Sequence, residues 1–168
     1  SVGRIPFYGS FSSLDKILKK TIMYDNETDR NWRRNVLLPM EPSDSLTSGM
    51  ALAQDIKNNL LVPNSFPFYR LGDTVGYGKS FLDVIDQNPP VEKIPCTSAN
   101  VLDTWKNFPY GLVVWWTHGS ARNASGIFHS NDAQYLNDAK PSCAFEVSCT
   151  NGDPEDSNNL GYALLKNG

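Results

Sequence analysis

The sequence predicts an α/β fold of three layers, in which helices flank a mostly parallel sheet. Apolar runs of strand length, such as Val36–Met40 and Leu112–Trp116, alternate along the chain with segments of helical periodicity. This alternation is typical of a parallel sheet built from strand–helix–strand units. The chain has 168 residues, of which 40% are hydrophobic and 20% are charged. This composition suits one domain with a core of its own.

The expected elements follow from periodicity and from the residues that end each segment. Apolar residues at helical spacing predict a helix over residues 11–23, with Ser12 or Ser13 as its N-cap. A second helix over residues 46–61 ends before Pro63, because the residue that precedes a proline is disfavoured in helical geometry. We further expect strands over residues 36–40, 66–71, 112–116 and 143–147, and helical segments over residues 79–87, 91–108 and 157–167.

Net charge and composition argue against nucleic acid as a binding partner and against a membrane-spanning segment. The net charge is −3, whereas nucleic-acid binding requires a basic face. No apolar run approaches the roughly 20 residues of a membrane-spanning helix. No signal peptide opens the chain, so the leader of a secreted protein would lie outside it. The three cysteines are too few for a disulfide framework.

Two of the expected strands lead directly into reactive residues. Residues 112–116 lead into His118 and Gly119, and residues 143–147 lead into Cys149. If the two strands are parallel neighbours, roughly 4.8 Å apart, the imidazole and the thiol lie side by side where α/β sheets bind ligands. A histidine in this position can take the proton of a cysteine and leave a thiolate nucleophile. The glycine allows a substrate to approach a backbone N–H that faces an oxyanion.

Other interpretations of these polar residues stay open. Cys96 and Cys143 are interpreted as structural, since cysteine often acts as a small hydrophobe. A metal site would have to combine His118, His129, Cys143 and Cys149, which lack the close ligand spacing of a structural zinc site. The oxygen-rich residues 153–158 can hold a structural calcium ion, or they can favour the start of a helix through their carboxylates.

A glycine-rich loop from Gly72 to Ser80 offers a competing function. It ends in Gly78-Lys79-Ser80 between an expected strand and an expected helix, like a phosphate-binding loop. The first glycine of that motif would have to stand at position 73, where Asp73 would instead oppose a phosphate. If the chain binds nucleotides, replacing Lys79 abolishes function. If the chain is a peptidase, replacing Cys149 abolishes function and replacing Lys79 leaves it largely intact.

The reactive residues also carry a resemblance to a known family. An apolar strand, His118-Gly119, a long spacer and a second strand ending at Cys149 resemble the caspase and legumain type of cysteine peptidase. The chain is more closely similar to the gingipain family. The opening residues 2–6 and the run 32–38 resemble the segment upstream of that family's histidine, and residues 160–165 resemble its helix after the cysteine. The family often has glycine where Thr117 stands.

This resemblance implies a caspase-like fold and a cysteine endopeptidase that forms an acyl-enzyme with protein or peptide substrates. It implies that His118 is the general base and Cys149 the nucleophile. The backbone N–H groups of Gly119 and Cys149 would form the oxyanion hole, and no cofactor is required. Cleavage after a basic residue would need an acidic pocket residue, for which Asp73, Asp83 and Asp103 are upstream candidates.

The resemblance also bears on location and completeness. It implies export, so that the parent protein is secreted or lies on the cell surface. It implies further strands before Ser1 and after Gly168. Residues 1–168 would then be a single catalytic domain or a fragment or subunit of a larger one, with the remainder of that domain as a partner. The alternative is a non-catalytic binding or scaffold module with the same fold.

Overall fold

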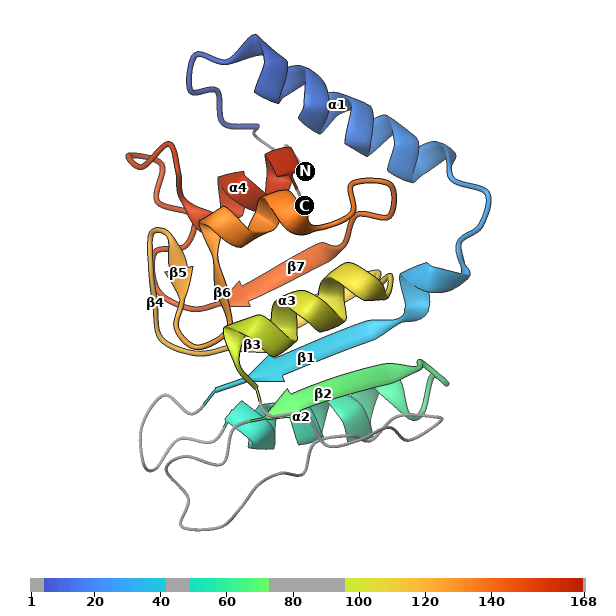
Figure 1. The fold of residues 1–168 in the computed structure, drawn as a ribbon. Helices are drawn as coiled ribbons and strands as arrows, with labels where there is room; N and C mark the ends of the chain where they lie inside the picture. The colour runs from blue at the N-terminus through green and yellow to red at the C-terminus, as the bar shows by residue number, and fades with distance from the viewer. Residues whose placement is uncertain (1–4, 42–48, 73–95, 168) are drawn as a thin grey trace.

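The computed structural model describes residues 5–41, 49–72 and 96–167, and a parallel sheet runs through these segments (Figure 1). The strands in this sheet lie in the order β2-β1-β3-β7, and all three pairings are parallel. Their bounds are β1 (Val36–Met40), β2 (Phe68–Gly72), β3 (Leu112–Trp116) and β7 (Cys143–Val147). The predicted α/β fold with a parallel sheet is therefore confirmed.

Helices cover both faces of the sheet, as predicted for a three-layer fold (Figure 1). On one face, α3 and α4 pack on β3 through buried residues that include Trp105, Trp115 and Leu160. On the other face, Ala53 of α2 packs on Val36, Leu38 and Met40 of β1. Successive strand residues point to opposite faces, so the two faces form two separate apolar cores. The helices are α1 (Phe11–Asn26), α2 (Gly49–Ile56), α3 (Ser98–Asn107) and α4 (Leu160–Asn167).

Several helix boundaries differ from the sequence prediction. The cap of α1 is Ser10, whose hydroxyl accepts a hydrogen bond from the Ser13 N–H at 3.2 Å, so the prediction of Ser12 or Ser13 was wrong. The helix α2 continues into a π-helical segment, η2 (Lys57–Leu61). A 3-10 turn, η1 (Asn31–Arg34), precedes β1. The expected helix over residues 79–87 lies outside the described residues, as does the glycine-rich loop beyond Gly72.

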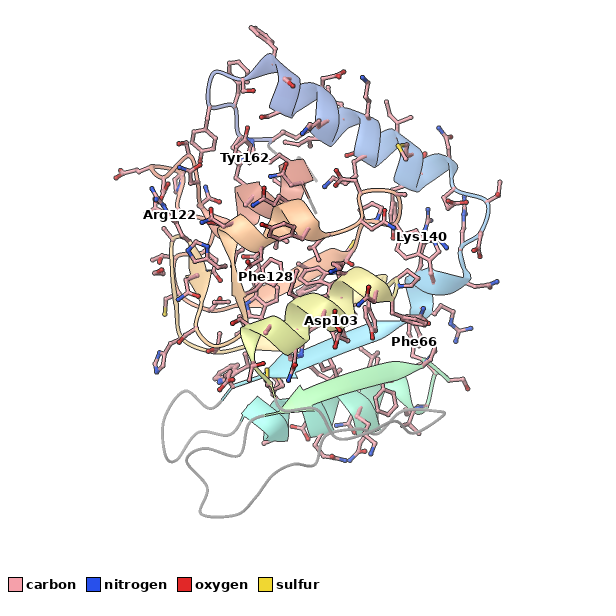
Figure 2. The ribbon with its side chains drawn as sticks, in the orientation of Figure 1. Phe66, Asp103, Arg122, Phe128, Lys140 and Tyr162 are labelled. Atoms are coloured by element: carbon pink, nitrogen blue, oxygen red, sulfur yellow. The ribbon has the colours of Figure 1, made fainter. Side chains whose placement is uncertain are left out.

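The polar segment between β3 and β7 contains structure that the sequence did not predict. It forms a small antiparallel sheet of β4 (Gly119–Ser120), β5 (Asn123–Ala124) and β6 (Phe128–His129), followed by the 3-10 helix η3 (Ser130–Tyr135). Phe128, labelled in Figure 2, anchors this segment. Its ring centroid lies 5.2 Å from that of Trp105, which in turn lies 6.3 Å from that of Trp115. The aromatic contacts hold the segment against the core. None of the helices in the described part of the chain has the length and apolar character needed to cross a membrane.

Candidate active site

The strands β3 and β7 end side by side. They pair in parallel from Leu112 opposite Cys143 to Trp116 opposite Val147, which confirms the predicted neighbour relationship. The Thr117 N–H extends this pairing by donating to the Val147 carbonyl at 3.2 Å. His118 follows β3 by two residues, Cys149 follows β7 by two residues, and both side chains are exposed. The fold thus brings both predicted catalytic residues to one edge of the sheet.

The backbones of Gly119 and Cys149 are in direct contact. A Cβ atom added at Gly119 would lie 2.8 Å from the Cys149 carbonyl oxygen and 3.0 Å from the Cys149 nitrogen, so only glycine fits without displacement. Thr150, immediately after the cysteine, has a φ of 55°, a conformation that costs free energy for a residue other than glycine. The two N–H groups predicted to form an oxyanion hole therefore belong to segments that touch each other.

Asn151 links the turn after β7 to the β4–β5 hairpin. Its side chain is only 3% exposed, and its Nδ2 group donates to the carbonyl oxygens of Ser120 at 2.6 Å and Asn123 at 3.1 Å. Its Oδ1 atom accepts a hydrogen bond from the Ser148 hydroxyl. That hydroxyl in turn accepts from Trp115 Nε1 at 3.0 Å. This buried network fixes the cysteine-bearing turn relative to the histidine-bearing hairpin.

The residue before the histidine has a structural role. Thr117 is buried, and its hydroxyl donates to the Ser125 carbonyl at 2.7 Å. The Ser125 N–H donates to the His118 carbonyl at 2.8 Å. These two bonds close the loop that begins at His118, so a threonine at this position is compatible with an ordered histidine segment.

Glu41 is a carboxylate at this edge that the sequence analysis missed. It follows β1 directly, and its N–H donates to the Trp116 carbonyl at 3.0 Å. A Cβ atom added at Gly126 would lie 2.9 Å from Glu41 Oε1, so the carboxyl group lies against the segment that carries His118. The signal in the sequence was an acidic residue immediately after an apolar strand.

The remaining predicted site residues are distributed elsewhere. Cys96 is buried, in keeping with its predicted structural role, whereas Cys143, for which the same role was predicted, is exposed at the end of β7 opposite to Cys149. None of the three cysteines forms a disulfide. His129 caps η3, since its Nδ1 atom accepts from the Asn131 N–H at 3.0 Å. No group of three or more metal-ligating side chains occurs among the described residues.

The oxygen-rich residues 153–158 form turns before α4. Asp156 pairs with Arg122 through contacts of 2.6 and 3.1 Å, and the hydrogen bond from Arg122 holds the pKa of Asp156 below its usual value. Asp153 accepts the Glu155 N–H at 2.9 Å. These carboxylates already have partners within the protein. Asp103 is exposed on α3 and accepts from Asn107, while Asp73 and Asp83 lie outside the described residues.

Both the sequence and the fold resemble known proteins. The sequence model of peptidase family C25 matches residues 1–168. The fold matches the crystal structure of the Arg-specific cysteine proteinase gingipain R with a TM-score of 0.67 and 20% identity, covering 94% of this chain and 34% of that chain. A complex of the Porphyromonas gingivalis RgpB pro- and mature domains matches with a TM-score of 0.67 and 18% identity, covering 94% of this chain and 35% of that chain. The chain thus spans about a third of each matched structure. No curated protein matches it.

Proposed function

Because the chain belongs to peptidase family C25, we propose that it carries the catalytic pair of a cysteine endopeptidase, with Cys149 as nucleophile and His118 as general base. The observation that carries this proposal is the contact between Gly119 and Cys149 at the ends of two neighbouring parallel strands. It brings an imidazole, a thiol and two backbone N–H groups to one edge of the sheet. This is the set of groups that acyl transfer requires.

The reaction proceeds in two stages. His118 takes the proton of the Cys149 thiol, and the thiolate attacks the carbonyl carbon of the scissile peptide bond. The resulting oxyanion accepts hydrogen bonds from the N–H groups of Gly119 and Cys149. The C–N bond breaks, the amine leaves with the proton from His118, and a thioester remains. Water then attacks the thioester with His118 as base, and the carboxylic acid and the thiol are released.

Neighbouring residues support this chemistry without taking part in bond changes. Glu41 positions the histidine segment through its contact at Gly126, and Asn151 positions the cysteine turn. The mechanism uses no cofactor. A calcium ion at residues 153–158 would be structural.

Substrate class and context are part of the same proposal. The matched gingipain R is described as Arg-specific, which supports cleavage after a basic residue of protein or peptide substrates. The chain covers about a third of that structure, which supports a larger catalytic domain as its context. Family membership also supports a secreted or cell-surface location.

A covalent peptide probe tests the proposed function. A peptidyl acyloxymethyl ketone with arginine at P1 is expected to label Cys149 with one equivalent, because the thiolate displaces the carboxylate leaving group and forms a thioether. Peptide mapping by mass spectrometry locates the label. A matched probe with norleucine at P1 should label more slowly if a basic residue is preferred.

The two exposed cysteines provide the controls. Cys143→Ala should label like the wild type, and Cys149→Ala should take up no probe. Equal labelling of Cys143 and Cys149, or no labelling of a folded chain, would favour a non-catalytic module with the same fold.

A further inference from the structure

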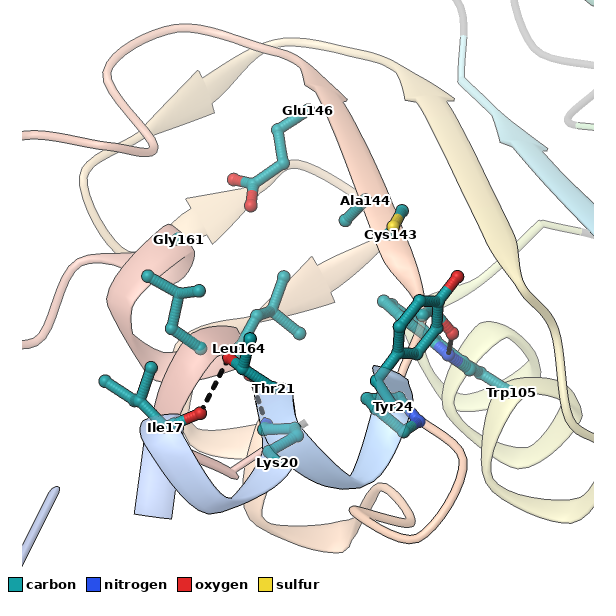
Figure 3. Close-up of a pocket in the computed structure, with 13 residues that line it drawn as sticks. Ile17, Lys20, Thr21, Tyr24, Trp105, Cys143, Ala144, Glu146, Gly161 and Leu164 are labelled. Atoms are coloured by element: carbon teal, nitrogen blue, oxygen red, sulfur yellow. Dashed lines mark hydrogen bonds between the residues drawn. The ribbon is translucent and has the colours of Figure 1, made fainter. Parts of the chain in front are cut away.

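A pocket of about 270 Å³ lies between α1, α4 and the end of β7 that begins at Cys143 (Figure 3). Its walls are mostly apolar and include Ile17, Ala144, Leu164 and Leu165. Pockets with apolar walls and few polar groups are typical of small-molecule sites. Among the described residues that line this pocket, Glu146 is the acidic one.

The Glu146 side chain is partly buried, and its carboxyl group has no partner among the described residues. Figure 3 shows it pointing from β7 toward α4, and a Cβ atom added at Gly161 would lie 3.7 Å from Oε1. Within the described ranges, no hydrogen bond or ion pair reaches this carboxyl group. Burial alone raises the pKa of Glu146 to about 7. No described residue therefore neutralises the negative charge of the ionised carboxylate, and a cation bound in the pocket would do so.

The other titratable groups of the pocket do not supply that cation. Lys20 Nζ donates to the Leu164 carbonyl at 3.0 Å and pairs with Asp138 at 2.9 Å, and Figure 3 draws it at the far end of the pocket from Glu146. Burial lowers the pKa of Lys20, opposed by Asp138. Burial, with a further contribution from Cys143, raises the pKa of Tyr24, so the phenol stays neutral near pH 7. Ionisation of Glu146 thus sets the charge of the pocket in this pH range.

We propose that this pocket binds a small organic cation, a primary ammonium group on an apolar body the size of a benzyl group. The ammonium would lie at Glu146, and the body would contact Ile17, Leu164 and Leu165. Charge complementarity selects this occupant, because a neutral ligand leaves the carboxylate unpaired and an anionic ligand is repelled. Binding here is independent of the proposed peptidase chemistry.

Three ligands of one shape and different charge test the proposal on the 168-residue chain. Benzylammonium, benzyl alcohol and benzoate are titrated while amide chemical shifts are followed by NMR. Benzylammonium should shift the amides of Glu146, Gly161 and Leu164 saturably, at least about tenfold more tightly than the alcohol, and benzoate should not bind. The affinity for benzylammonium should rise about tenfold from pH 6 to pH 8, because only the ionised carboxylate pairs with it.

Matched variants separate the carboxylate from the cavity. Glu146→Gln should remove both the preference for ammonium and the pH dependence, while Glu155→Gln, at an exposed carboxylate, should keep both. Thr21→Phe, at an exposed residue that lines the pocket, should weaken all binding. The proposal is overturned if the alcohol binds as tightly as the ammonium, if a folded Glu146→Gln variant keeps the preference, or if no ligand saturates at millimolar concentration.

Discussion

Replacing Asn151 with alanine is expected to lower kcat/KM for peptide hydrolysis by about 100-fold, because the proposed nucleophile, Cys149, and the proposed base, His118, lose their common anchor. The side chain bonds to the carbonyls of Ser120 and Asn123 in the hairpin and to the Ser148 hydroxyl beside Cys149. Its removal takes a partner from three part-buried polar groups and leaves a cavity at a buried position, which should also lower the free energy of unfolding by about 1–3 kcal/mol. Hydrolysis of a fluorogenic peptide with arginine at P1, and urea unfolding, measure the two effects.

The positioning role is separable from general destabilisation. Activity is compared well below the unfolding temperature, where the variant is fully folded, and alkylation of Cys149 is followed in parallel. The control is Asn158→Ala, at an exposed asparagine that bonds to Asp156 through its backbone N–H. If the folded Asn151→Ala protein matches this control in kcat/KM within threefold, Asn151 does not position the site.

Replacing Gly111 with alanine is expected to destabilise the fold by about 3 kcal/mol or more. The new Cβ atom would lie 2.1 Å from the Arg33 carbonyl oxygen and 2.2 Å from Arg33 Cα. Backbone hydrogen bonds keep Gly111 from moving away to relieve this clash. The Gly111 N–H donates to the Asn35 carbonyl, and the Gly111 carbonyl accepts from the Cys143 N–H, both at 3.0 Å. The entry to β3 would have to separate from both neighbouring strands.

Gly152→Ala provides the matched substitution. A Cβ atom at Gly152 would have nothing within 4 Å, so its free energy of unfolding should stay within about 0.5 kcal/mol of the wild type. Chemical denaturation of both variants measures the difference. Equal stability of the two would show that the contact of Gly111 with Arg33 does not restrain the sheet.

The sequence was most informative where apolar runs were long. The run 112–116 is apolar at all five positions and the run 143–147 at all but Glu146, and the strands they predicted are confirmed as parallel neighbours. His118 and Cys149 each follow the end of one of these strands. The sequence therefore predicted that they lie at one edge of the sheet, because the carboxyl ends of parallel strands share an edge. The fold class followed from the same local signals.

Contacts between polar residues that are far apart in the sequence could not be predicted from local sequence patterns. The strands of the small antiparallel sheet span two residues each, too few to show a period of two. The bonds of Asn151 to Ser120 and Asn123 join residues about thirty apart in sequence, and they depend on the backbone path of the hairpin. Glu41 was missed for the same reason, since its contact at Gly126 exists only after the strands have paired.

The central claim is that His118 activates Cys149, and the rate of thiol alkylation tests it most directly. At pH 6.5 an ordinary thiol is only about 1% thiolate, so a cysteine that transfers its proton to a histidine should react faster. Iodoacetamide labelling, mapped by mass spectrometry, is compared for the two exposed cysteines, Cys149 and Cys143. We expect Cys149 to react at least about tenfold faster than Cys143.

The two histidines of the chain then identify the activating group. His118→Ala should reduce the rate at Cys149 to that at Cys143, and His129→Ala, which alters only the cap of η3, should leave it unchanged. Equal rates at the two cysteines in the wild type, or a fast Cys149 that does not respond to His118→Ala, would contradict the catalytic pair.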